Sequence, residues 1–324
     1  MKRSHDAVNI LMIPGADAIE ESSLRLACLG IDSVVQELKK TQLLLDQNQI
    51  SLDLMKFMRE PNALTPGWFH HLAVATVPVQ TALYQEYLNH HGRPDIVLSC
   101  SLGDVARNVS IGAIRLEDAV LTMFKFIESV TQQNSGMSCH LSSPDPFTVE
   151  QIKILQDQGV EIGVYQTPFH LMLGGSFAVI KKAVTIIDSN FQMKLKPLYP
   201  YPLHTSLMKP CLEAISAQIA TTPIQQWSGP RLYSSVQGRW LTGAEELRFD
   251  MAQNIISTVQ WKESLDCLFD QFPDAKYFNL GPAPTLMSFH SKCLPKTSFA
   301  NHFFEHLLKT QQDENSLETL NVQA

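Results

Sequence analysis

Two short apolar runs predict buried parallel strands. Residues 8–13 are almost entirely apolar and stop at Pro14-Gly15, and residues 95–99 end in a turn-forming stretch. Apolar runs without alternation are typical of strands whose two faces are both covered. Other apolar residues recur at helical spacing, which predicts covering helices. The predicted helical segments are residues 20–58, 71–90 and 116–132, with a last helix around Phe303, Phe304, Leu307 and Leu308.

The segment 71–90 contains a proline in its interior. Val74 and Val77 precede Pro78, and Leu83 and Leu88 follow it at near-helical spacing. Proline lacks the backbone N–H and its ring clashes with the preceding turn. We therefore expect the regular part of this helix to begin only at Pro78.

Residues 134–198 differ from the rest, because short strands and helices follow one another closely. The order strand–helix–strand–strand–helix–strand is typical of a ferredoxin-like unit. We expect this segment to be an inserted subdomain between two parts of one core, residues 1–133 and 199–308, with a loose polar tail at 309–324. The predicted elements are 137–141, 148–158 with Thr148 as the N-cap, 160–165, 170–173, a helix opened by Gly174-Gly175-Ser176 and ending at Ile187, and 193–197.

Composition narrows the class of protein. The chain has 324 residues, 44% hydrophobic residues and a net charge of -7, which is unlike the basic footprint of a nucleic-acid-binding protein. Its apolar runs are shorter than the roughly 18 residues of a membrane-spanning helix, and the N-terminal run is too short for a signal peptide. We expect a cytoplasmic protein that binds neither nucleic acid nor membrane.

The cysteines predict free thiols rather than a metal site. No two of them form C-x-x-C, and none lies at zinc-ligand spacing from a histidine. We therefore expect no metal. The six are Cys28, Cys100, Cys139, Cys211, Cys267 and Cys293.

The stretch from Ser99 to Asp104 lies between a predicted strand and a predicted helix. A serine at such a turn has the geometry of a nucleophile elbow, in which the next backbone N–H, here that of Leu102, faces the oxyanion. The usual pattern is Gly-x-Ser-x-Gly, and Ser99 replaces its first glycine. An ordinary strand–helix turn explains this spacing equally well. Cys100 is a weaker alternative nucleophile to Ser101, and for Asp104 a favourable interaction with the helix dipole is sufficient explanation.

Six short motifs follow one another along most of the chain. They are Ile13 to Asp17, Ser99 to Asp104, Tyr165 to His170, Leu203 to Met208, Val259-Gln260-Trp261 and Leu280-Gly281-Pro282. In this order they resemble the motifs F-P-G-Q-G, G-H-S-x-G-E, Y-N-S-P-x-Q, F-H-S-P-L-M, P-V-x-W and x-G-P-G of the malonyl-CoA:acyl-carrier-protein transacylase family, the acyltransferases of fatty acid and polyketide synthesis. The resemblance covers about residues 8 to 305. It implies an α/β fold, with a parallel sheet in an α/β-hydrolase-like core.

The resemblance implies a serine–histidine pair. Ser101 would attack a thioester carbonyl and carry the acyl group, and His204 would take and return the proton. By itself His204 reads as a buried structural histidine. The family pattern further implies that the backbone carbonyl of Asn254 orients His204, and that the N–H groups of Leu102 and Ala16 form the oxyanion hole.

The acyl pocket departs from the family pattern. Members that select malonyl groups carry an arginine where this chain has Phe126, and an apolar side chain does not offset the desolvation of a buried carboxylate. Leu203 lies in the tetrad Tyr201-Pro202-Leu203-His204, which differs from the sequences typical of malonyl selectors. Gln166 and His170 replace a family asparagine and a family glutamine. We therefore expect an uncharged acyl group.

Three functions fit this pattern. The first is a proofreading hydrolase that releases non-malonyl acyl groups from acyl carrier proteins in polyketide synthesis. The second is a trans-acting acyltransferase that moves an acyl group from CoA to a carrier protein. The third is a non-catalytic subunit that docks a carrier protein, which the intact Ser101 and His204 disfavour. The expected partner is acyl carrier protein, with acyl-CoA as a further substrate. No cofactor is expected, because the substrate brings its own phosphopantetheine.

Overall fold

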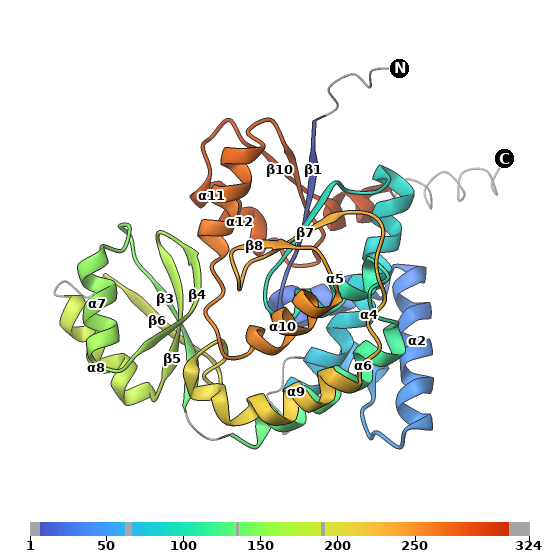
Figure 1. Ribbon diagram of the computed structural model, residues 1–324, viewed down its shortest axis with the longest axis horizontal. Coiled ribbons are helices and arrows are strands. Elements are labelled where there is room, and N and C mark those ends of the chain that lie inside the picture. Colours follow the sequence, from blue (N-terminus) through green and yellow to red (C-terminus); the bar gives the residue numbers. More distant parts are fainter. Residues whose placement is uncertain (1–6, 62–66, 134–135, 189–191, 311–324) are drawn as a thin grey trace.

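The computed structural model describes residues 7–61, 67–133, 136–188 and 192–310, which form two sheets and their covering helices (Figure 1). The larger sheet has the strand order β10-β9-β1-β2-β7-β8. Its neighbouring strands are parallel except for the β7–β8 hairpin. The expected α/β class is confirmed, with one antiparallel strand added at an edge. The strands are β1 (Asn9–Ile13), β2 (Ile96–Ser99), β7 (Arg231–Ser234), β8 (Arg239–Leu241), β9 (Lys276–Asn279) and β10 (Ala300–His302).

Strand β1 lies in the middle of this sheet. Ile10 pairs with Ile96 of β2 on one side and with Tyr277 of β9 on the other. The pairing continues past the strand ends, because the Cys100 N–H donates to the Ile13 carbonyl at 3.0 Å. The loop after β1 and the turn after β2 therefore lie side by side, at the carboxyl edge where α/β folds place their sites.

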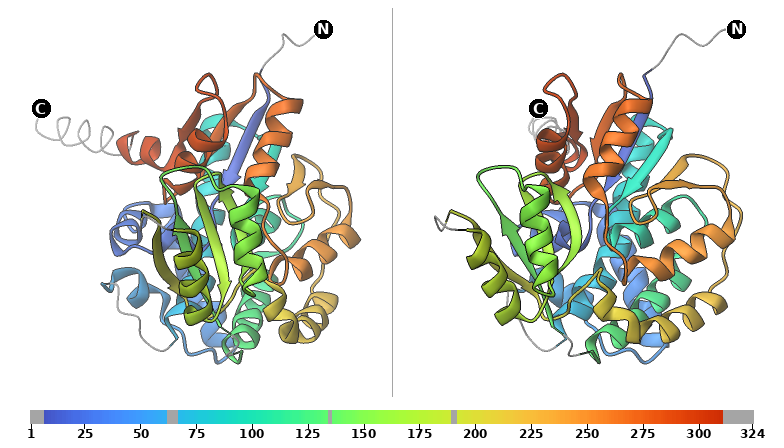
Figure 2. Two further views of the ribbon diagram at one scale, coloured as in Figure 1. Left: turned by 90° about the vertical axis from the view of Figure 1, so that its left-hand side faces the viewer. Right: turned by 60° about the vertical axis from the view of Figure 1, so that its left-hand side comes forward.

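Helices cover both faces of the sheet (Figure 2). In the described part of the chain, none of them is long and apolar enough to cross a membrane. Residues 303–310 are also helical, and residues 311–324 of the predicted tail lie outside the described ranges. The helices of the core are η1 (Ala16–Ile19), α1 (Ser22–Cys28), α2 (Asp32–Gln47), α3 (Leu54–Arg59), α4 (Trp68–His91), α5 (Gly103–Ser110), α6 (Leu116–Thr131), η2 (Ser206–Cys211), α9 (Leu212–Thr221), α10 (Ala244–Asn254), α11 (Trp261–Gln271) and α12 (Thr285–Cys293).

Helix α4 corrects the prediction for its start. It begins at Trp68 and continues through Pro78 without ending there. Its residues from Leu72 to Tyr84 are all buried, so burial of apolar surface outweighs the loss of one backbone hydrogen bond. The Gln80 side chain of this helix donates to the Pro14 carbonyl at 2.6 Å, which anchors the loop after β1.

The smaller unit is an antiparallel sheet of order β4-β5-β3-β6 with two helices on one face. Strand and helix order is that of a ferredoxin-like unit. Thr148 and Gln151 form a capping box at the start of α7. The unit has its own core, which includes Leu141, Leu155 and Leu171. Its elements are β3 (Met137–Ser142), α7 (Val149–Asp157), β4 (Glu161–Thr167), β5 (His170–Gly175), α8 (Phe177–Ile187) and β6 (Lys194–Tyr199).

Strand β4 attaches this unit to the larger one. The Tyr165 N–H donates to the Val259 carbonyl, and the Val259 N–H donates to the Gly163 carbonyl, both at 2.9 Å. At Gly163 a Cβ atom would lie 2.7 Å from the carbonyl oxygen of Leu203. This close approach brings the segment that contains Leu203 and His204 against the smaller sheet, at the boundary between the two units.

Candidate active site

Ser101 occupies a strained turn between β2 and α5. Its φ is +55°, a left-handed conformation that costs a non-glycine residue about 1–3 kcal/mol. Two residues later, a Cβ atom at Gly103 would lie 2.5 Å from the carbonyl oxygens of both Ile13 and Pro14. Only glycine allows the turn to approach the loop after β1 this closely. The backbone therefore has the form of a nucleophile elbow, with Ser101 at its tip.

The loop after β1 faces this turn. A Cβ atom at Gly15 would lie 3.0 Å from the Cys100 carbonyl and 3.2 Å from the Ser101 Cβ. The N–H groups of Ala16 and Leu102, both predicted for the oxyanion hole, donate no hydrogen bond within the described residues. Two unpaired donors on either side of a serine are what an oxyanion hole requires.

His204 lies directly against Ser101. Its Nε2 is 2.7 Å from the Ser101 Oγ, and its Nδ1 is 2.5 Å from the carbonyl oxygen of Asn254. The backbone N–H of His204 donates to the Ile255 carbonyl at 2.9 Å. The structure thus brings together the three residues that the sequence assigned to nucleophile, base and orienting carbonyl.

The hydrogen bonds of His204 define its protonation. A carbonyl oxygen only accepts, so Nδ1 carries the ring proton and Nε2 is left to accept the Ser101 hydroxyl. The side chain is 2% exposed, and this burial lowers the pKa of His204 to about 4, although the bond to Asn254 acts in the opposite direction. At neutral pH His204 is therefore an uncharged proton acceptor, as a general base must be.

A cleft of about 1160 Å³ opens in front of this pair. The four residues predicted for the acyl pocket, Phe126, Leu203, Gln166 and His170, all line it. Around Phe126 the wall is formed by apolar residues of α6. Among the described residues the cleft is lined by no arginine, and its lysines come from β6 and α12 instead. The apolar α6 residues are Met123, Ile127 and Val130.

His170 differs from the other predicted pocket residues in its contacts. Its Nδ1 is 2.8 Å from the Thr167 Oγ1, and its Nε2 is 3.2 Å from the Lys292 Nζ. Burial lowers the pKa of His170 to about 4, and Lys292 and His140 add to this. Sequence reasoning missed Lys292, because nothing near it in the chain indicates a contact 122 residues away.

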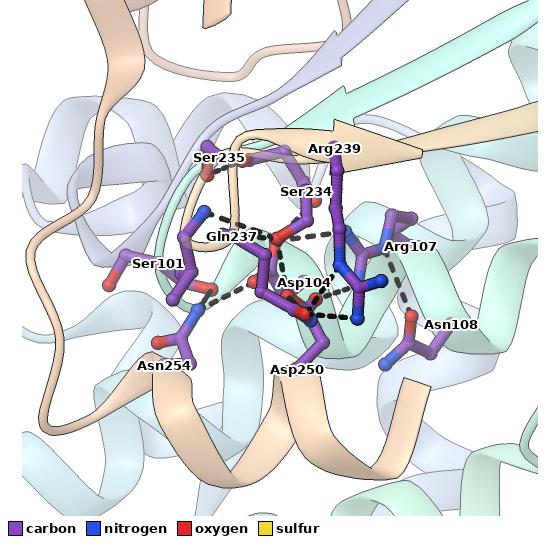
Figure 3. Close-up of polar contacts among 12 residues, drawn as sticks. Ser101, Asp104, Arg107, Asn108, Ser234, Ser235, Gln237, Arg239, Asp250 and Asn254 are labelled. Atoms are coloured by element: carbon purple, nitrogen blue, oxygen red, sulfur yellow. Dashed lines mark hydrogen bonds and ion pairs between the residues drawn. The ribbon is translucent and has the colours of Figure 1, made fainter. Parts of the chain in front are cut away.

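Behind the site lies a buried polar cluster (Figure 3). Asp104 is 3% exposed, and its carboxylate accepts hydrogen bonds from Ser99 and Asn254. Arg107 is fully buried and bonds to Asp250 at 3.0 Å. The sequence explained Asp104 by the helix dipole alone, and that explanation was incomplete. Arg107 is not among the residues that line the cleft.

The described residues contain no group of three or more histidine, cysteine or acidic side chains arranged to hold a metal ion. Cys100, the alternative nucleophile, is 8% exposed. Burial raises the pKa of its thiol well above the usual value, and Asp17 and Asp104 add to this. Because the thiolate is the nucleophilic form, Cys100 is an inert neighbour of Ser101.

Comparison with known proteins finds distant relatives in sequence, although no family model matches the chain. In sequence the chain is 22% identical to the malonyl CoA-acyl carrier protein transacylase of Bacillus subtilis, over 65% of this chain and 68% of that protein. It is 26% identical over 72% of its length to a highly reducing polyketide synthase of Strobilurus tenacellus, but spans only 9% of that protein.

Solved structures of malonyl transacylases superpose on nearly the whole of this chain. The malonyl CoA-acyl carrier protein transacylase (FabD) of Coxiella burnetii superposes with a TM-score of 0.82 at 16% identity, covering 94% of this chain and 97% of that one. A malonyl-transacylase in complex with its type II polyketide acyl carrier protein gives 0.82 at 15% identity, covering 94% and 100%. This chain thus has the fold of the malonyl-CoA:acyl carrier protein transacylases and is distantly similar in sequence to polyketide synthases.

Proposed function

We propose that this protein forms an acyl-enzyme on Ser101 from a thioester carried by phosphopantetheine. The observation that carries the proposal is the chain of contacts from Ser101 Oγ to His204 Nε2 and from His204 Nδ1 to the Asn254 carbonyl. A hydroxyl is a weak nucleophile until a base within hydrogen-bond reach removes its proton. Neutral His204 is such a base.

The chemistry follows from this arrangement in two halves. Ser101 Oγ attacks the thioester carbonyl while its proton passes to His204 Nε2, and the N–H groups of Ala16 and Leu102 donate to the oxygen that becomes negative. The C–S bond then breaks, and the thiol leaves with the proton from His204. In the second half, water or another thiol gives its proton to His204 and attacks the acyl-serine. The bond between the acyl carbon and Ser101 Oγ then breaks, and His204 returns the proton to Oγ, which restores both residues.

The wall around Phe126 supports an uncharged acyl group. Phe126 is 9% exposed and lies among apolar residues of α6, so a malonyl carboxylate there would be desolvated without a partner. Desolvation of an ion costs several kcal/mol. Acetyl or longer alkyl chains would instead gain from burial, at about 0.8 kcal/mol per CH₂ group.

Acyl carrier protein is the proposed partner, with acyl-CoA as a further donor. Support comes from a malonyl-transacylase with the same fold, which was solved in complex with its acyl carrier protein. Both donors end in the same phosphopantetheine arm. The proposal needs no cofactor in the protein, since that arm arrives with the substrate.

Hydrolysis and transfer both pass through the acyl-enzyme, and the departures from the family pattern favour hydrolysis. Intact-mass analysis of acetyl-carrier protein mixed with the enzyme and an unloaded second carrier separates them. Free acid with unloaded carriers would establish the hydrolase, and acyl groups on the second carrier would establish the transferase. Ser101→Ala is the control. The assay is repeated with carrier protein that holds longer acyl chains. Wild-type protein that behaves like this variant with every acyl group would contradict the proposed acyl-enzyme and favour the docking function.

A further inference from the structure

The orienting partner of His204 is a backbone carbonyl, in the position where many serine enzymes use a carboxylate. No carboxylate among the described residues accepts a bond from His204 Nδ1. The position of a carbonyl oxygen is set by whatever anchors its own residue. The anchor of Asn254 therefore decides where His204 points.

The side chain of Asn254 reaches back to the helix of the nucleophile. Its Nδ2 donates to Asp104 Oδ2 at 2.5 Å and lies 3.4 Å from the Ser101 carbonyl oxygen. The other carboxylate oxygen of Asp104 accepts from the Ser99 hydroxyl. One carboxylate therefore connects the strand before the nucleophile, the helix after it, and the helix end that orients the base.

A buried ion pair repeats this connection one helical turn away. Arg107 Nη2 lies 3.0 Å from Asp250 Oδ2, and Arg107 Nη1 lies 3.4 Å from Asp104 Oδ1. Asp104 and Arg107 are three residues apart on α5, and Asp250 and Asn254 are four apart on α10, so each pair shares one face of its helix (Figure 3). Two carboxylates against one guanidinium leave an excess of negative charge.

We propose that Asp104 and Asn254 are positioning residues for the serine–histidine pair: ionised Asp104 holds Asn254 so that its carbonyl meets His204 Nδ1 while Nε2 meets Ser101 Oγ. This rests on the proposed function of that pair. In this role neither residue exchanges a proton. The Ser101 proton moves to Nε2, the Nδ1 proton stays in its bond to Asn254, and the excess negative charge favours the imidazolium that forms.

The pH dependence of the reaction reports on this arrangement. Burial raises the pKa of Asp104 to about 6, with Asp250 acting in the same direction and Arg107 of its own helix in the opposite one. Protonation of Asp104 puts a hydrogen on a group that must accept from both Ser99 and Asn254. The reactivity of Ser101 should therefore fall as the pH decreases through about 6, well before His204 is protonated.

The test uses a fluorophosphonate, which labels activated serines regardless of the natural acyl group, with the labelling rate followed by intact mass. Asn254→Ala keeps the backbone carbonyl but removes its anchor, and should slow labelling by on the order of 100-fold. The neighbouring Gln253→Ala, whose side chain contacts Ser257 instead, should stay within about twofold. Equal labelling of wild type and Asn254→Ala would overturn the proposal.

Two further variants separate positioning from folding. Asp104→Asn should lose the decrease near pH 6 and stay slow at every pH. Asn254→Asp faces Asp104 with a second carboxylate, so the two need a shared proton and labelling should be faster at pH 5 than at pH 8. A wild-type pH profile in either variant would contradict the proposal. Wild-type protein that resists labelling, like Ser101→Ala, would instead remove the proposed function and this inference together.

Discussion

Ser101 Oγ lies 2.7 Å from His204 Nε2, although the two residues are 103 positions apart in the chain. Both residues have a left-handed backbone conformation. Their φ angles are +55° and +60°. Such conformations persist in non-glycine residues only where the surroundings hold them in place. Here the backbone of both reacting residues is strained, so the site lowers the stability of the fold and the surrounding contacts must offset this cost.

The strain at Ser101 should be measurable as stability. Ser101→Gly relieves the positive φ, so we expect this variant to be about 1 kcal/mol more stable than Ser101→Ala in urea unfolding. At Ser110, a helical position in α5, the order should reverse, with alanine more stable than glycine by about 0.5–1 kcal/mol. The same order at both positions would refute the strain at the elbow.

Gly103 should be intolerant of any side chain. Gly103→Ala places a Cβ atom against two carbonyl oxygens, so we expect a loss of about 1–3 kcal/mol in unfolding free energy, and slower labelling of Ser101. Gly243, where a Cβ atom meets nothing within 4 Å, provides the control. Gly243→Ala should change stability by less than about 1 kcal/mol. Equal effects of the two substitutions would count against the close approach.

Phe126 should decide against malonyl groups. In Phe126→Arg a guanidinium can pair with a free carboxylate, so acylation of Ser101 by malonyl-CoA should increase about tenfold or more, and acylation by acetyl-CoA should decrease. The measurement is the intact mass of the acyl-enzyme over time. Lys125→Arg is the control, because Lys125 is exposed and paired with Glu128. If wild-type protein takes malonyl as fast as acetyl, Phe126 does not exclude the carboxylate.

Buried, neutral His204 should make stability depend on pH. Its pKa is about 4 in the folded protein, below the ordinary 6.5, so the unfolded chain binds the proton more tightly. Wild-type protein should therefore lose stability relative to His204→Gln as the pH falls from 6.5 to 4, by up to roughly 3 kcal/mol. Unfolding in urea at a series of pH values measures this difference. A difference that stays constant over that range would mean that His204 is not buried as a neutral ring.

The regular elements were largely readable from the sequence, because their signals are local. The apolar runs that became β1 and β2, and the order of elements in the ferredoxin-like unit, follow from residue spacing alone. Pro78 was misread for the same reason. A local rule predicts a break there, whereas the burial of α4 on its neighbours outweighs one lost hydrogen bond.

The sequence by itself identified a serine at a turn, a family-like histidine, and a phenylalanine where malonyl selectors carry arginine. The tertiary structure decided how they meet. It brought His204 against Ser101, and it joined Asp104 to Asn254 across 150 residues and Arg107 to Asp250 across 143. Such contacts leave no pattern in the chain, because a backbone carbonyl has no side-chain signature and a buried ion pair depends on two helices that meet only after folding.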